Sequence, residues 1–238
     1  MSVDVMDAAA VESLAAEAVK RWGHIDAWVN NAGVGVIGSF TEVPLEEHRR
    51  VIETNLMGYV HGAYAALKVF KRQGFGTLVN NASVCSRLVV PNLAAYTASK
   101  FAVRGLTHSL RQDLAVEGIK DIHVCQINPG LIDTPAFQHA GNFSGLPLKI
   151  RLPMTTAETV AKAIVRLIER PKREAFVGHF AGLGSLAYTL MPALTGAVLV
   201  FMMKKLYFDS DEKTPKTEGN LHRPLPSKAD VNRTSTAH

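Results

Sequence analysis

The sequence is poor in cysteine, with Cys85 and Cys125 as the two thiols among 238 residues. Both lie in apolar runs, and their spacing is not that of metal ligands. This scarcity excludes a disulfide-stabilised scaffold, and we expect no metal site. We therefore predict two buried thiols in a reducing, cytoplasmic compartment.

The sequence also lacks a secretion signal and a cluster of basic residues. Residues 1–7 hold two acids and no base, which is not the basic-then-apolar pattern of a signal peptide. The net charge is +5, but the lysines and arginines are scattered along the chain, with short pairs such as Arg49-Arg50 and Lys204-Lys205. A protein surface that binds nucleic acid needs its basic side chains gathered on one face. We therefore expect no nucleic-acid partner.

What the sequence does contain is an alternation of strand and helix patterns. Apolar spacing and capping residues predict helices over residues 8–22, from Pro44 to about Gly74, after Pro91, and over 156–170. Short apolar runs predict strands at 25–31, 77–82, 122–127 and 175–177, and residues 133–153 are expected to form a long mobile loop. This order predicts an α/β fold with a Rossmann-like, doubly wound parallel sheet that binds ligands at the carboxyl ends of its strands.

We predict three regions: an α/β domain (1–178), an apolar and helical segment (179–208) and a polar tail (209–238). Residues 175–203 contain no Asp, Glu, Lys or Arg, and are interrupted by four glycines and one proline. They could form the last strand and a helix at a subunit interface or substrate entrance, or a membrane-surface helix over 186–206. The tail is expected to be disordered or loosely docked, because it has little apolar surface to bury.

The sharpest chemical pattern is Tyr96 followed four residues later by Lys100, near the start of a predicted helix. Residues four apart project from one helix face. An ammonium beside a phenol favours the phenolate and lowers its pKa from about 10, so the pair could exchange a proton with a carbonyl or alcohol oxygen. The same spacing also arises by chance as a solvated helix pair.

Two polar residues could complete this site. Ser83 follows a predicted strand, at the edge where a parallel sheet binds its ligand, and its hydroxyl could hold a substrate oxygen in line with Tyr96. Its alternative role is to cap a turn. Asn55 lies inside an apolar helix, where it could kink the helix and hold a water that relays protons to Lys100. Its alternative is a structural amide with satisfied hydrogen bonds.

Together these residues resemble the ordered motifs of the short-chain dehydrogenase/reductase family. The series is Asn30-Asn31-Ala32-Gly33, Asn55, Ser83, Tyr96, Lys100, Pro129-Gly130 and Thr134. The separations also fit, with 13 residues from Ser83 to Tyr96 and 29 from Lys100 to Pro129. The resemblance covers residues 4–178, and it implies hydride transfer between NAD or NADP and an alcohol or carbonyl substrate.

The resemblance also implies a role for each residue. Tyr96 is the general acid/base, Lys100 tunes it and binds the nicotinamide ribose, Ser83 orients the reacting oxygen, and Asn55 anchors the proton relay. Cofactor contacts are implied for Asp4 and Val5 at the adenine, for Asn31, Ala32 and Gly33 at the adenosine ribose, and for Pro129, Gly130, Ile132 and Thr134 at the nicotinamide. Residues 136–152 take the place of a substrate lid, whose Phe137, Phe143, Leu146 and Leu148 suggest a hydrophobic alcohol or ketone. Subunits are expected to associate as a homo-oligomer through the long helices.

The sequence departs from the family at its start. Members open with a strand and a glycine-rich turn that holds the cofactor pyrophosphate. Here 29 residues precede Asn30, and Gly23 is the one glycine among them. We therefore expect a sheet without its first two strands, with a free strand edge, and weak binding of the cofactor. The sequence does not indicate whether that cofactor is NAD or NADP. A non-catalytic binding or scaffold protein with the same fold, associated with membranes through the apolar segment, is the alternative function.

Overall fold

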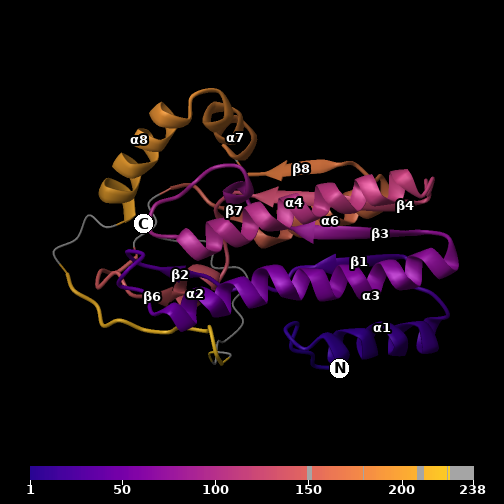
Figure 1. The fold of residues 1–238 in the computed structure, drawn as a ribbon. Coiled ribbons are helices and arrows are strands. Elements are labelled where there is room, and N and C mark those ends of the chain that lie inside the picture. Colours follow the sequence, from indigo (N-terminus) through magenta and orange to yellow (C-terminus); the bar gives the residue numbers. More distant parts are fainter. Residues whose placement is uncertain (149–151, 179, 208–211, 224, 226–238) are drawn as a thin grey trace.

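The computed structural model describes residues 1–148, 152–178, 180–207, 212–223 and 225. Four parallel strands form its central sheet, in the order β1-β3-β4-β8 (Figure 1). Their bounds are Ala27–Asn30 for β1, Gly76–Asn81 for β3, Ile122–Pro129 for β4 and Glu174–Val177 for β8. All four lie where the sequence predicts strands. The α/β class and the parallel sheet are therefore confirmed.

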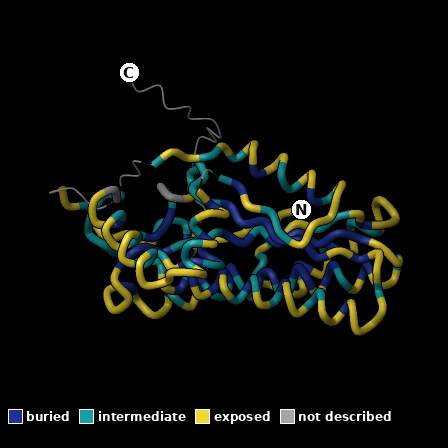
Figure 2. Tube along the Cα trace, turned by 90° about the horizontal axis from the view of Figure 1, so that it is seen from above, coloured by how far each residue is buried: buried dark blue, intermediate teal, exposed yellow. Residues whose placement is uncertain are grey.

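Apolar side chains alternate along the strands and face helices on both sides of the sheet. On one face, Leu78 and Val124 join a buried cluster with α1 (Ala8–Trp22), α3 (Gly58–Gln73) and α4 (Ala94–Val116). On the other face, Val79 and Cys125 pack against α6 (Ala157–Glu169). Figure 2 shows the buried strands running through the middle of the molecule, between helices with exposed outer faces.

Strand β1 forms one edge of the described sheet, because it pairs with β3 and with no second strand among the described residues. Val29, on this strand, is exposed. A free edge at this strand is what the resemblance predicts for the chain.

The long helix predicted after Pro44 is divided. Helix α2 covers Leu45–Ile52, a π-helical turn follows at Glu53–Met57, and α3 continues to Gln73. Gly74 ends α3 with a φ of 88°, a left-handed conformation that favours glycine. The π-turn contains Asn55, so the predicted distortion of the helix at this amide is present.

The segment expected to be a loop without regular structure contains short elements, and that prediction is wrong. Strand β2 (Val36–Ile37) pairs with β6 (Gly141–Asn142), and β5 (Ile132–Asp133) pairs with β7 (Thr155–Thr156). Helix α5 covers Ala136–His139. These two-residue pairings join residues far apart in the sequence. The local spacing of apolar residues therefore does not predict them. Residues 149–151, within the predicted lid, lie outside the described part.

The single helix considered over residues 186–206 is also wrong. The structure has α7 at Ala181–Leu190, α8 at Pro192–Met202 and a π-helical turn at Met203–Tyr207. The break falls at Met191, because Pro192 has no N–H to continue the hydrogen bonding of α7 and is instead the first residue of α8. Within the described residues, neither helix has the length and hydropathy needed to cross a bilayer.

For residues 212–223, which we call the C-terminal strap, the structure has the second of the two alternatives, a docked segment and not a disordered one. Leu221 is 1% exposed and packs with Val51 and Val36. The backbone of Thr217 exchanges two hydrogen bonds with that of Asn142, at 2.7 and 2.9 Å. His222 Nε2 lies 2.9 Å from a carboxylate oxygen of buried Glu47. One leucine and a set of polar contacts thus fix a segment whose polar composition predicts exposure to solvent. The rest of the predicted tail, except for residue 225, lies outside the described residues.

Candidate active site

Ser83, Tyr96 and Lys100 meet at the carboxyl edge of the sheet. Ser83 directly follows β3 and opens a short 3-10 turn at Val84–Ser86, where its Oγ accepts a hydrogen bond from the Cys85 N–H at 3.1 Å. Tyr96 and Lys100 lie in the first two turns of α4, with Lys100 Nζ 5.6 Å from the centre of the Tyr96 ring. The Ser83 hydroxyl is close enough to influence the ionisation of Tyr96. The structure therefore brings together the phenol, the ammonium and the hydroxyl that the sequence singles out.

Lys100 is held by two residues that the sequence analysis did not name. Its Nζ donates to the Asn81 carbonyl at 3.0 Å and lies 5.0 Å from the centre of the Tyr59 ring. The Tyr59 hydroxyl donates to the same carbonyl at 2.7 Å. Two features of the sequence could have indicated them. Tyr59 lies four residues after Asn55, and Asn81 is the last residue of β3, at the edge of the sheet.

Asn55 ties three parts of the site together and is fully buried. Its Oδ1 accepts from the Val34 N–H at 2.8 Å, and its Nδ2 donates to the Val34 carbonyl at 2.9 Å and to Ser99 Oγ at 3.2 Å. These contacts fix the backbone after Gly33 against α4, beside Lys100. Both amide atoms are used by the protein itself, so the geometry favours the structural role for Asn55 over that of a water-holding relay.

Burial controls the ionisation of this site. It lowers the pKa of the Lys100 ammonium to about 8 and raises the pKa of the Tyr96 phenol well above its ordinary value. It also raises the pKa of the nearby Cys85 thiol to about 11. For Tyr96, burial is the largest cause of the raised pKa, the neighbouring Cys85 adds to it, and the Ser83 hydroxyl opposes it. The lowering by Lys100 that the sequence predicts is not among these causes.

Most residues predicted to contact a cofactor line the same edge of the sheet. Residues 31–33 follow β1 and are exposed, and the Asn81 Nδ2 donates to Asn31 Oδ1 at 2.6 Å. Pro129 ends β4, and the Gly130 N–H donates to the Val177 carbonyl at 2.8 Å. Ile132 lies in β5, with Thr134 just beyond it. Residues 31–33 and 129–130 therefore lie at the same carboxyl edge of the central sheet as Ser83, which follows β3.

Asp4 and Val5 lie on a different element. Val5 packs against Gly58 at the start of α3, and its carbonyl lies 2.9 Å from His61 Nδ1. Exposed Asp4 accepts from the Met6 N–H at 3.0 Å. The structure thus places Val5 beside the end of the π-turn that carries Asn55.

The polar groups around Lys100 fit the hydroxyls of a ribose. Among the contacts of the described residues, Lys100 uses one hydrogen bond of its three donors, and the nearby Asn81 Oδ1 is buried with no partner. A methyl group on Gly33 would come within 3.3 Å of Asn55 Oδ1 and 3.9 Å of Lys100 Nζ. Glycine at this position therefore lets the Asn55 amide and the Lys100 ammonium lie close to the backbone.

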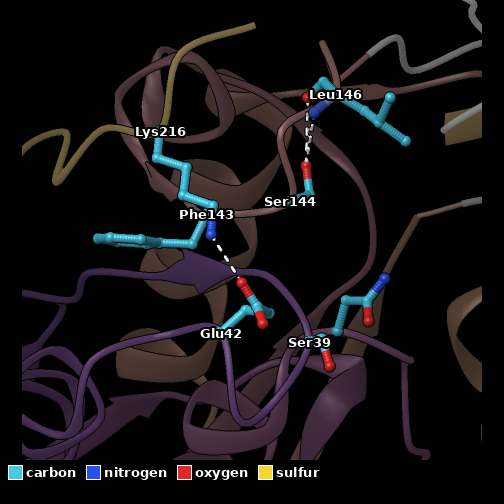
Figure 3. Close-up of a pocket in the computed structure, with 7 residues that line it drawn as sticks. Ser39, Glu42, Phe143, Ser144, Leu146 and Lys216 are labelled. Carbon is cyan, nitrogen blue, oxygen red and sulfur yellow. Dashed lines mark hydrogen bonds and ion pairs between the residues drawn. The ribbon is translucent and has the colours of Figure 1, made fainter. Parts of the chain in front are cut away.

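A pocket of about 240 Å³ lies between the predicted lid and the strap (Figure 3). Phe143 and Leu146 supply its apolar lining, and the ion pair between Lys216 and Glu42, 2.7 Å long, closes one side. Phe143 and Tyr96 pack against the same buried cluster. Tyr96 is not among the described residues that line the pocket, and Phe143 is the lining residue that shares a cluster with it. No sequence pattern linked Lys216 to the pocket. Of the other predicted lid residues, the side chain of Phe137 lies outside the description.

Comparison with known proteins gives consistent matches. The family model described as short chain dehydrogenase matches residues 1–144. An uncharacterized oxidoreductase, YxnA of Bacillus subtilis, is 32% identical over 214 residues, which cover 89% of this chain and 60% of that protein. The 2-(R)-hydroxypropyl-CoM dehydrogenase of Xanthobacter autotrophicus is 39% identical over 138 residues, 57% of this chain and 54% of the relative. The chain thus spans about 60% or less of the length of these two relatives.

Solved structures resemble the fold as well. The alcohol dehydrogenase of the archaeon Thermococcus sibiricus, complexed with 5-hydroxy-NADP, is 26% identical with a TM-score of 0.62, over 74% of this chain and 72% of that one. A short chain dehydrogenase of Burkholderia cenocepacia, in complex with NADP, has a TM-score of 0.70 over 84% of this chain and 77% of that one. Because the Burkholderia structure is 22% identical to this chain, its similarity supports the fold alone.

Proposed function

This chain belongs to the short-chain dehydrogenase family, and from that premise we propose that it carries the proton-transfer part of an oxidoreductase acting on an alcohol or carbonyl substrate. The convergence of Tyr96, Ser83 and Lys100 at one sheet edge carries the proposal. NAD or NADP, when bound, supplies or accepts the hydride.

The described contacts support a specific role for each side chain. Burial keeps the Tyr96 phenol protonated at neutral pH, so it can donate a proton to a carbonyl oxygen as that oxygen becomes negative. The Ser83 hydroxyl lies beside the phenol and orients the same oxygen. Lys100, anchored on the Asn81 carbonyl at 3.0 Å, directs its remaining donors toward the ribose and favours the phenolate that forms during transfer. Asn55 is a positioning residue, which fixes the backbone after Gly33 against α4.

We propose that the chain itself binds NAD or NADP weakly. The groups described around Lys100 suit the nicotinamide ribose, whereas the residues ahead of Asn30 contain no glycine-rich turn for the pyrophosphate. Fluorescence titration with reduced cofactor measures this directly, and micromolar binding would contradict it.

For the substrate, we propose a small alcohol or ketone with an apolar body. The pocket of about 240 Å³ supports this proposal, because it is lined by Phe143 and Leu146, and Phe143 packs against the same buried cluster as Tyr96. For assembly, we propose a homo-oligomer formed through α3 and α4, on which Tyr64 and Phe101 are exposed. Light scattering of the purified chain, alone and as a Tyr64→Glu variant, tests the assembly.

The test of the activity uses reduced nicotinamide mononucleotide as hydride donor at millimolar concentration, because this donor does not need a pyrophosphate clamp. We expect slow reduction of members of a panel of hydrophobic ketones, with a loss of at least about 100-fold in Tyr96→Phe. Leu45→Glu, at an exposed position of α2, is the control and should retain the activity.

Two results would contradict the proposal. One is turnover that Tyr96→Phe leaves unchanged. The other is saturable binding of ketone and mononucleotide, observed by ligand NMR, with no turnover; that result would favour the non-catalytic binding protein.

A further inference from the structure

Helices α7 and α8 form an apolar hairpin (residues 181–202) with little of its surface buried in the rest of the protein. Leu183 and Leu190 are each 68% exposed, and Leu194 is 59% exposed. Six further large apolar residues at or next to the hairpin are also exposed: Phe180, Leu186, Met191, Val198, Val200 and Phe201. Contiguous apolar exposure on this scale marks an interaction surface.

Most of the surface of α8 is exposed, because Leu194, Val198 and Phe201 are exposed and only the face of Thr195 and Leu199 is half-buried. No residue of α8 is buried, and Thr195 is its one polar side chain. A surface helix of a globular protein normally has one apolar face and one polar face, whereas a helix apolar on every side lies within protein or lipid. Figure 1 shows α8 extending from the end of α7, away from the layers of sheet and helix.

Charge distinguishes between the two candidate partners, a second copy of this chain and a lipid surface. Residues 175–208 contain no acid, and exposed Lys204 and Lys205 immediately follow the hairpin. A second copy would bring the same lysines to the same interface and would offer no acid of the hairpin to pair with them. An anionic lipid surface has negative charge beside an apolar interior. These two features match the two lysines and the apolar helices that precede them.

We propose that the hairpin docks on an anionic lipid surface, with its apolar side chains below the headgroups and Lys204 and Lys205 at the level of the lipid phosphates. Since neither helix is long enough to cross a bilayer, the hairpin lies in the interface plane. The proposal is independent of the catalytic one, because it rests on surface and charge alone.

Flotation of the full chain with vesicles tests the proposal. We expect it to float with vesicles of phosphatidylcholine containing about 30% phosphatidylglycerol, and less with phosphatidylcholine alone. The change Leu194→Glu with Val198→Glu should lower binding at least tenfold. Lys204→Gln with Lys205→Gln should lower binding to the anionic vesicles about 30-fold and remove most of its salt dependence.

Leu45→Glu adds a charge at a leucine of α2 that is more exposed, at 77%, and should float like the unaltered chain. Circular dichroism of every variant establishes that a loss of binding is not a loss of fold. Absence of flotation with anionic vesicles would overturn the proposal. So would flotation that the two glutamates leave unchanged. A dimer that these glutamates dissociate, with no vesicle binding, would instead assign the hairpin to a second copy of the chain.

Discussion

Replacing Lys100 with methionine is expected to stabilise the folded protein while removing its activity. Lys100 is 4% exposed, and burial lowers the pKa of its ammonium from 10.5 to about 8. At neutral pH the fold therefore holds a charge in surroundings that disfavour it. Methionine has a similar length and no charge. Its introduction leaves the Asn81 carbonyl satisfied, because the Tyr59 hydroxyl still donates to it at 2.7 Å.

The size and sign of the effect follow from the two pKa values. Below pH 8, Lys100 is protonated in both states, and the cost of burying the charge is fully present, at about 3 kcal/mol. Between pH 8 and 10.5 the unfolded chain keeps its proton while the folded chain releases it. The unfolded state then binds more protons, so stability rises with pH until the cost has disappeared.

Urea unfolding of the two proteins at a series of pH values from 7 upward measures this difference. At pH 7 the midpoint of Lys100→Met should lie about 1 M higher in urea, and the gap should close as the pH approaches 10.5. The raised pKa values of Cys85 and the tyrosines affect both proteins and largely cancel. A variant that is less stable at pH 7, or a gap that does not change with pH, would refute the reasoning.

Three further predictions concern other parts of the molecule. Asn55→Leu removes the partner of the half-buried Val34 N–H and carbonyl, and should lower the free energy of unfolding by about 3 kcal/mol in a urea titration; a change below about 1 kcal/mol would show that water replaces the amide. Leu221→Ala should release the strap and speed hydrogen exchange of its amides at least about 30-fold, whereas unchanged exchange would mean that polar contacts hold it. Cys85, with a pKa raised to about 11, should react with a disulfide reagent at pH 8 much more slowly in the fold than in urea, and equal rates would contradict its burial.

Local patterns in the sequence predicted the elements that local chemistry determines. Asp7 accepts from the Ala10 N–H, and Gly23 ends α1 with a φ of 83°, as their residue types suggest. Tyr96 and Lys100 share a face of α4 because they are four residues apart, and Ser83 reaches them because it follows a strand of a parallel sheet. The motif residues at the sheet edge could therefore be found without coordinates.

Contacts between distant segments could not be read from the sequence. The strap is fixed by Leu221, one apolar residue in a polar stretch, and by backbone hydrogen bonds to Asn142, which any residue type could make. The surroundings of Tyr96 could not be read for a related reason. Spacing shows that an ammonium is near, but the burial that raises the pKa of Tyr96 depends on how α4 packs against the rest of the site.

The π-turn at Glu53–Met57 sets the relative phase of α2 and α3. Each residue gained or lost in a helix rotates everything beyond it by about 100°. The wide turn accommodates an additional residue, so that Asn55 faces Val34 and Ser99 while Ala63 and Phe70 still face the sheet. Shortening this stretch by one residue would leave the helix intact but turn either the amide or the apolar stripe away from its target. Length, rather than side-chain identity alone, is thus under constraint here, and insertions or deletions should be tolerated far less well than substitutions on the exposed face of α2.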